Sequence, residues 1–236
     1  MHRELILGLS PFFLIAFALF AALFRFFPNI DVAASSLFFR ENSSFLLENS
    51  PVGFAVYYGV DAAATILTLF FIFYLIFSFI KRKPNFLGLP RILVIYLALA
   101  YIIGPGIVVN ELLKDKIGRA RPFQTSYFMG KADFSPAFKV TEFGGKYASF
   151  VSGHAAFGFY WLSLAFPMKN RANRRKYLSA GICLGAGIGL VRIMQGKHFL
   201  SDVVFSFFFI YMSAAILWFI IEKVCRKELA ESGPFG

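Results

Sequence analysis

Six long apolar runs constrain the fold of this chain more than any other feature of its sequence. They lie at approximately residues 5–27, 53–80, 91–113, 148–167, 177–194 and 201–222. A helix needs roughly 20 apolar residues to cross about 30 Å of hydrocarbon, where only helices and closed barrels satisfy their own backbone groups. Hydrophobic residues make up 58% of the chain, above the roughly 45–50% of soluble domains. We therefore expect an all-α integral membrane protein, a six-transmembrane-helix bundle that forms a single domain over residues 1–236.

The segments between these runs differ in charge. Cytoplasmic loops of membrane proteins are enriched in Lys and Arg, and basic residues gather after the second, fourth and sixth runs. They are Lys81, Arg82, Lys83, Arg91, Lys169, Arg171, Arg174, Arg175, Lys176, Lys223, Arg226 and Lys227. We therefore expect both termini in the cytoplasm, and segments 28–52, 114–147 and 193–200 on the outer side. The first run is too long for the apolar part of a signal peptide, so we expect it to be retained as a span.

Charge and cysteine content narrow the class of function. The net charge of +11 fits basic loops that contact anionic lipid headgroups, so we expect no nucleic-acid partner. Cys183 and Cys225 lack the spacing of a metal site or a redox pair. Because the chain holds three histidines in all, we expect no metal site with several histidine ligands. We also expect no cofactor.

A first cluster of polar residues follows the third run, at its outward end. It reads KDKIGRARP over residues 114–122, and its Lys114 and Arg121 are spaced so that they can share one helical face. Pro122 is expected to turn the chain. Interfacial snorkelling by Lys and Arg is the alternative, but cations gathered on the outer side run against the charge bias and favour a functional role.

A second cluster, Ser152-Gly153-His154, begins the fourth run. Free N–H groups and the helix dipole favour anions at a helix N-terminus, and glycine permits a phosphate to approach the backbone closely. The alternative is a serine cap followed by a histidine without function.

A third cluster reads VRIMQGKHFLSD and joins the fifth run to the sixth. Arg192 ends one run, and His198 and Asp202 lie four residues apart on one helical face, so the carboxylate can hold one ring nitrogen. An ion pair without chemistry is the alternative. Together the clusters can perform phosphoryl transfer without a metal. Cations and N–H groups hold the phosphate, one histidine attacks phosphorus, and the other protonates the leaving oxygen and then activates water.

These three clusters make the chain resemble the type 2 phosphatidic acid phosphatase superfamily of integral-membrane phosphatases. The family motifs K-x6-R-P, P-S-G-H and S-R-x5-H-x3-D read here KDKIGRARP, VSGH and VRIMQGKHFLSD, in the same order, within about residues 100–210. The resemblance implies His198 as the nucleophile that forms a phosphohistidine, Asp202 as its orienting group, His154 as general acid and base, and Lys114, Arg121, Ser152, Gly153 and Arg192 as phosphate ligands.

Two positions depart from the family motifs, and the flanking residues narrow the resemblance. Val151 stands where the family usually has proline, and Val191 where it usually has serine. Neither change removes a proposed catalytic group, so we expect activity with altered selectivity. The residues around the motifs are more similar to bacterial lipid A phosphatases, especially the 4′-phosphatase branch, than to diacylglycerol-phosphate enzymes. These flanking stretches read GPGIVVNELLKDKIGRARP, SFVSGHAAFGF and QGKHFLSDVVF, and FPNID follows the first run.

The resemblance implies a multi-pass protein of the bacterial cytoplasmic (inner) membrane, with its active site facing the periplasm. The expected partners are the bilayer and a phospholipid or lipid A substrate, with no obligate protein partner. A lipid A 1-phosphatase, a phosphatidylglycerophosphate phosphatase and an undecaprenyl pyrophosphate phosphatase are the alternatives, and a membrane transporter is the alternative from another class.

Two further features have open roles. Asp61 lies about two turns into the second run, where it either neutralises a cation near the active-site end or faces another helix as a satisfied polar residue. The loop 123–147 is long, and its Lys131, Lys139 and Lys146 either contact a polyanionic headgroup or anchor at the interface.

Overall fold

The computed structural model describes residues 7–82, 85–142 and 147–226 of the 236-residue chain. Most of these residues are helical, and the strands among them are two residues long. The elements are α1 (Pro11–Phe26), α2 (Asn29–Ser36), α3 (Pro51–Ile80), β1 (Asn85–Phe86), β2 (Leu89–Pro90), α4 (Arg91–Tyr101), η1 (Ile102–Lys114), α5 (Asp115–Ile117), η2 (Pro122–Gln124), η3 (Ser126–Phe128), α6 (Gly153–Tyr160), η4 (Trp161–Ala165), α7 (Arg171–Met194) and α8 (Leu200–Val224).

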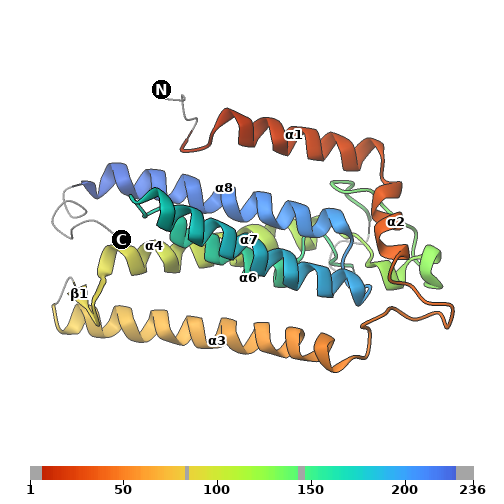
Figure 1. Cartoon of the computed structure of the whole chain (residues 1–236), viewed down its shortest axis with the longest axis horizontal. Helices are drawn as coiled ribbons and strands as arrows, with labels where there is room; N and C mark the ends of the chain where they lie inside the picture. The colour runs from red at the N-terminus through yellow and green to blue at the C-terminus, as the bar shows by residue number, and fades with distance from the viewer. Residues whose placement is uncertain (1–6, 83–84, 143–146, 227–236) are drawn as a thin grey trace.

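The long helices run back and forth along one direction and form a bundle (Figure 1). α1 packs along α8 through aromatic pairs, of which Phe13 and Tyr211 are stacked with ring centroids 4.5 Å apart. α6 lies inside the bundle against α7, α8 and η1, and its residues from Ala155 to Tyr160 are buried. The start of α1 and the end of α8 lie at the same end of the bundle (Figure 1).

The helices agree only in part with the six expected spans. Four are long and apolar enough to cross a membrane, namely α3, α4 with η1, α7 and α8. The helices α1 and α2 are bent by 81° to one another, and together they would make a fifth span if the pair is taken as one. The expected run 148–167 contains an eight-residue α-helix followed by a five-residue 3₁₀-helix, which is shorter than the roughly 20 residues of a full crossing. The count of six spans therefore stays a prediction.

Capping residues explain why two helices are shorter than the apolar runs around them. α1 starts at Pro11 because the Ser10 hydroxyl accepts a hydrogen bond from the Phe13 N–H, and proline suits the first helical position. α6 starts at Gly153 because Ser152 caps it, so the first residues of the 148–167 run remain loop. The apolar character of α6 reflects packing against other helices as well as any contact with lipid.

Small residues let α7 approach its neighbours closely. A Cβ atom on Gly185 would lie 2.2 Å from Cδ1 of Phe159 on α6, and one on Gly189 would lie 2.3 Å from Cγ1 of Val203 on α8. These two glycines are four positions apart. Small residues at this spacing are typical of helix contacts in membranes, where close van der Waals packing replaces a hydrophobic driving force. The sequence of α7 therefore fixes it against the buried helix α6.

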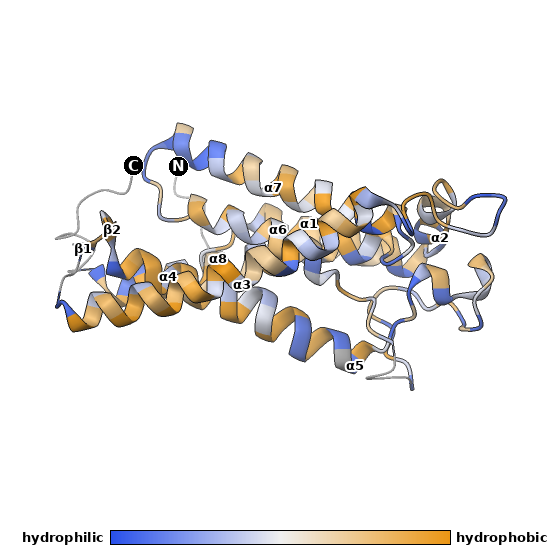
Figure 2. Cartoon of the chain, turned by 90° about the horizontal axis from the view of Figure 1, so that it is seen from below, coloured by the Kyte–Doolittle hydropathy of each residue, from blue (hydrophilic) through white to orange (hydrophobic). Residues whose placement is uncertain are grey.

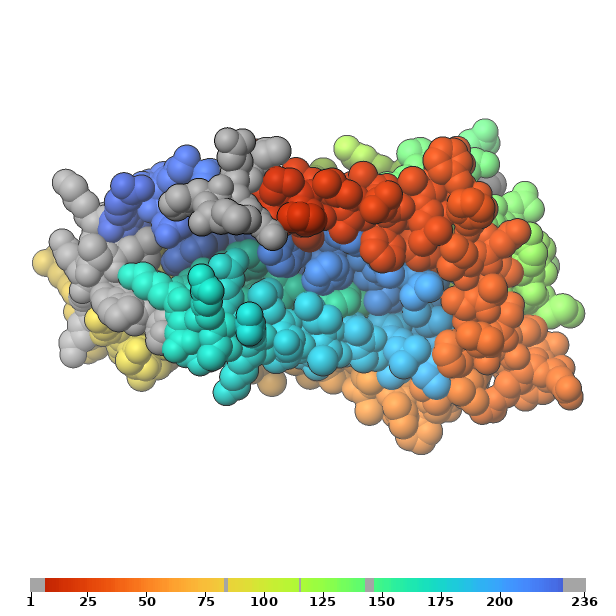
Figure 3. Space-filling model, turned by 45° about the horizontal axis from the view of Figure 1, so that its top comes forward, coloured from red at the N-terminus to blue at the C-terminus, as the bar shows by residue number. Residues whose placement is uncertain are grey.

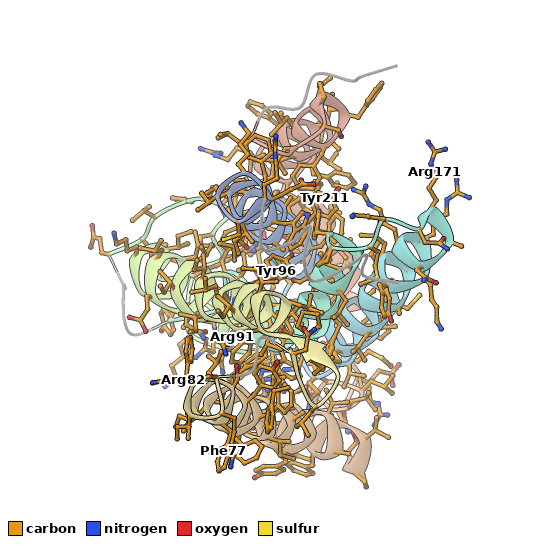
Figure 4. All side chains as sticks on the ribbon, turned by 90° about the vertical axis from the view of Figure 1, so that its left-hand side faces the viewer. Phe77, Arg82, Arg91, Tyr96, Arg171 and Tyr211 are labelled. Carbon is orange, nitrogen blue, oxygen red and sulfur yellow. The ribbon has the colours of Figure 1, made fainter. Side chains whose placement is uncertain are left out.

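The two ends of the bundle differ in what they carry. Hydrophobic residues dominate the helices, and hydrophilic residues gather toward the ends (Figure 2). One end carries Arg82, Arg91 and Arg171 (Figure 4). At this end Arg91 joins α4 to α3, because its Nε donates to the Ser78 hydroxyl at 2.6 Å. The opposite end is covered by the segment from α2 to the start of α3 (Figure 3).

Candidate active site

The three sequence clusters meet at the end of the bundle opposite Arg82 and Arg171. The loop before α6 contacts the start of α8, because the Ser152 N–H donates to the Asp202 carbonyl at 3.1 Å. The end of η1 reaches the start of α6, because a Cβ atom on Gly153 would lie 2.8 Å from Lys114 Nζ. Side chains that are up to about 90 residues apart in the chain thus share one site.

His198 is held by a backbone carbonyl in addition to the expected carboxylate. Its Nδ1 lies 2.8 Å from the Ser149 carbonyl oxygen and 3.4 Å from Asp202 Oδ2. A carbonyl can only accept a hydrogen bond, so Nδ1 carries the proton and Nε2 keeps a free lone pair. His198 is buried, and this burial lowers the pKa of its imidazole to about 4 even though Asp202 opposes the shift. The ring is therefore neutral and nucleophilic at physiological pH.

Asp202 is a fully buried carboxylate with several donors. Its Oδ2 accepts hydrogen bonds from the Ser149 hydroxyl at 2.6 Å and from the Phe199 N–H at 2.8 Å. Its Oδ1 accepts from Nη1 of Arg119 at 2.6 Å. These bonds keep the carboxylate ionised and fix it beside His198.

Arg119, which the sequence did not single out, links Asp202 to the segment after α1. Its side chain is fully buried, and its Nη2 forms an ion pair with Asp31 Oδ2 at 2.8 Å. Asp31 also accepts from the N–H of Ser201 at 2.8 Å and from its hydroxyl at 2.6 Å. A guanidinium between two carboxylates satisfies the charges that burial would otherwise make costly. The signals in the sequence were Arg119 inside the first cluster and Asp31 inside FPNID, but 88 positions separate the two residues.

The start of α6 has the features of an anion site. Ser152 is the N-cap, and its hydroxyl accepts a hydrogen bond from the Ala155 N–H at 3.4 Å. The first N–H groups of a helix have no intrahelical partner. Lys114 Nζ lies beside Gly153 and donates to Asn110 Oδ1 at 2.7 Å. A phosphate at this position would meet both the helix N-terminus and an ammonium group.

Three further cations lie close enough to repel one another. Arg192 is buried, and its Nη1 donates to Gln195 Oε1 at 2.7 Å. Burial lowers the pKa of the Arg121 guanidinium, and burial together with the charge of Arg121 lowers the pKa of Lys197. Lys197 Nζ lies 4.0 Å from the ring centroid of Phe123. A bound anion would relieve this repulsion, and Lys197 is a member of the group that the sequence did not identify.

His154 faces α3. Its ring is stacked on Tyr57 with centroids 5.1 Å apart, and its Nε2 lies 3.8 Å from Asp61 Oδ1. The structure thus places Asp61 at the active-site end of the second apolar run. Tyr57 is a further member of the site that the sequence did not identify.

The remaining positions of interest have simple surroundings. Val151, which replaces the usual proline, is fully buried next to Ser152. Val191 is partly buried on α7. Lys131 and Lys139 are exposed, and Lys146 lies outside the described residues. Within residues 7–82, 85–142 and 147–226, no group of three or more His, Cys, Asp or Glu side chains is placed to hold a metal ion.

Known proteins are similar to this chain over most of its length. The model of the PAP2 superfamily matches residues 91–225. The chain is 34% identical over 211 residues to a lipid A 4′-phosphatase of Francisella tularensis subsp. novicida (strain U112). This alignment covers 87% of this chain and 90% of the relative. The chain is also 30% identical over 226 residues to a lipid A 4′-phosphatase of Rhizobium leguminosarum. This second alignment covers 89% of this chain and 95% of the relative. No solved structure matches the chain significantly.

The matched residues 91–225 contain all three clusters that meet at one end of the bundle, and they make up more than half of the chain. This chain therefore belongs to the PAP2 superfamily.

Proposed function

We propose that this protein is a lipid phosphatase that removes the 4′-phosphate of lipid A through a phosphohistidine intermediate. The observation that carries the proposal is the hydrogen bond between His198 Nδ1 and the Ser149 carbonyl, which leaves Nε2 free as a nucleophile beside a group of cations. Two relatives that align with most of this chain are named lipid A 4′-phosphatases, and this supports the choice of substrate.

In the first step Nε2 of His198 attacks phosphorus, and the bond from phosphorus to the lipid oxygen breaks. His154 gives a proton to that oxygen, so the lipid leaves as an alcohol. Lys114, Arg121 and Arg192 stabilise the charge on the phosphoryl oxygens, together with the N–H groups at the start of α6. Asp202 stabilises the positive charge that the His198 ring acquires.

In the second step a water molecule attacks the phosphohistidine, and the bond from phosphorus to Nε2 breaks. His154, which lost its proton in the first step, accepts a proton from this water. Inorganic phosphate leaves, and both histidines return to their starting states. The step draws on side chains of this protein and on water, so we propose that no metal or cofactor takes part.

We further propose that the chain is one domain with six spans in the bacterial cytoplasmic membrane. Both termini and the end that carries Arg82, Arg91 and Arg171 would lie in the cytoplasm, in line with the excess of basic residues there. The site would then face the periplasm. The lipid A phosphate would approach the start of α6 from the outer leaflet, and the exposed Lys131 and Lys139 would lie on that outer side.

The test presents the purified full-length protein, in EDTA, with a panel of lipids. The panel holds lipid A with phosphate at both positions, lipid A with phosphate at one position, phosphatidylglycerophosphate and undecaprenyl pyrophosphate. We expect phosphate release and a product mass that shows loss of the 4′-phosphate, and we expect His198→Ala to abolish both while the protein still folds. Loss of the 1-phosphate or preference for another lipid would refute the substrate, and loss of activity in EDTA would refute the metal-free mechanism.

A further inference from the structure

Two residues of α3 face the ring of His154. Tyr57 and Asp61 are four positions apart on this helix, so they lie on one face of it. The rings of Tyr57 and His154 are nearly parallel, at an angle of 25°. His154 Nε2 is buried without a hydrogen-bond partner among the residues that the structure describes, and Asp61 Oδ1 lies 3.8 Å from it. This distance is too long for a hydrogen bond but is within ion-pair range.

Tyr57 contacts a second member of the site. The Arg192 Cζ atom lies 5.4 Å from the centroid of the Tyr57 ring. A guanidinium within about 6 Å of an aromatic centroid is attracted by the electrons of the ring. Tyr57 therefore contacts both a proposed phosphate ligand and the proposed acid–base residue, and it limits how the imidazole of His154 can rotate.

The charges around His154 give Asp61 a specific role. Arg192, Lys114 and Arg121 all interact electrostatically with the His154 ring. Repulsion from these cations opposes the positive charge that His154 must carry after it accepts a proton from water. The carboxylate of Asp61 is 57% exposed, and at 3.8 Å from Nε2 it offsets this repulsion.

We propose that Asp61 and Tyr57 are positioning residues for His154 in the hydrolysis of the phosphohistidine. Tyr57 holds the plane of the imidazole, and Asp61 stabilises the imidazolium that forms when His154 takes the proton of the attacking water. This inference rests on the proposed function. The matched part of the family model begins at residue 91, so both residues lie outside it. The site is thus completed by a helix that the shared motifs do not include.

The experiment follows both chemical steps by rapid quench with lipid A that carries ³²P in its 4′-phosphate. Labelled His198 reports the first step, and released phosphate reports the second. For Asp61→Asn we expect the hydrolysis of the phosphohistidine to slow by about tenfold or more, so that labelled enzyme accumulates while KM is unchanged. We expect Asp61→Glu to recover part of the rate and Tyr57→Leu to slow the same step. Glu41→Gln, which alters an exposed carboxylate of the outward loop, is the matched control and should behave as wild type.

The outcomes separate the two proposals. Wild type without labelled His198 would refute the phosphohistidine mechanism itself. Labelled wild type together with normal hydrolysis in Asp61→Asn would refute the role of Asp61 alone. That role is likewise refuted if Asp61→Asn changes KM and leaves the rate of hydrolysis unchanged. It is also refuted if Asp61→Glu hydrolyses the phosphohistidine as slowly as Asp61→Asn although both variants melt at the wild-type temperature.

Discussion

Replacement of Asp31 by asparagine tests whether the buried charge network holds the active-site end together. The Asp31 carboxylate is fully buried and accepts three hydrogen bonds, from Arg119 at 2.8 Å and from the N–H and hydroxyl of Ser201 at 2.8 and 2.6 Å. Asparagine has nearly the same shape but no charge, and its NH₂ group cannot accept from these donors. The substitution leaves Arg119 with Asp202 as its remaining carboxylate partner.

The size of the effect follows from burial. Removal of one partner from a buried ion pair typically costs about 3–5 kcal/mol, because the other charge stays buried. We expect about 3 kcal/mol, at the lower end, because Arg119 keeps its ion pair with Asp202. For a chain of this length, a loss of about 3 kcal/mol lowers the melting temperature by roughly 6–12 °C.

The assay is thermal unfolding of the purified protein in detergent, with Glu41→Gln as an exposed control in the segment between α2 and α3. We expect the control to melt within about 2 °C of wild type, since surface substitutions usually change stability by less than about 0.5 kcal/mol. Asp31→Asn that melts as high as the control would refute the reasoning. A double mutant with Arg119→Met should be less destabilised than the sum of the single mutants, because the two residues contact each other directly.

Three other predictions concern the site and the packing of α7. Burial lowers the pKa of His198 to about 4, so the ring loses its nucleophilic lone pair only as the pH falls to that value. In single-turnover experiments with saturating substrate, the rate of His198 phosphorylation should fall to half near pH 4. A fall to half already near pH 6.5, the ordinary histidine pKa, would contradict this. Gly153→Ala should displace Lys114, since the added Cβ would lie 2.8 Å from Nζ, and should raise KM by about tenfold with normal folding, from the loss of one charged contact. Gly185→Ala should reduce stability by about 1–3 kcal/mol in a thermal melt, because the added Cβ overpacks the helix contact. Gly187→Ala should not, because its Cβ would meet nothing within 4 Å. Equal melting temperatures for the two variants would refute the close contact at Gly185.

The candidate site could be predicted residue by residue where the sequence spacing is local. His198 and Asp202 lie four positions apart at the start of a helix, and Ser152 directly precedes one, so local rules place them correctly. The hydrogen bond from His198 to the Ser149 carbonyl was not predictable, because a backbone carbonyl carries no sequence signal. The Arg119 ion pair to Asp31 was missed for a related reason, since many charged residues are compatible with such a long-range pair.

The length of the apolar runs could not separate lipid contact from burial. Run 148–167 is as apolar as its neighbours, yet the structure makes it a short helix inside the bundle, where α7 and α8 cover it. Periodicity also gave no reason to join Asp61 to His154, because α3 and α6 are far apart in the chain. These two outcomes depend on which helices pack together.

Local composition by itself determined the class of the protein, the approximate positions of its long helices and the residue types that the chemistry needs. Hydrocarbon excludes unpaired backbone groups, so a run that crosses the membrane as a single segment must be helical whatever its neighbours are. Only the tertiary structure decided that Asp61 lies beside His154 and that Arg119 pairs with Asp31. The physical reason is that ion pairs and hydrogen bonds act over a few ångströms, and helix packing alone brings distant segments within that range.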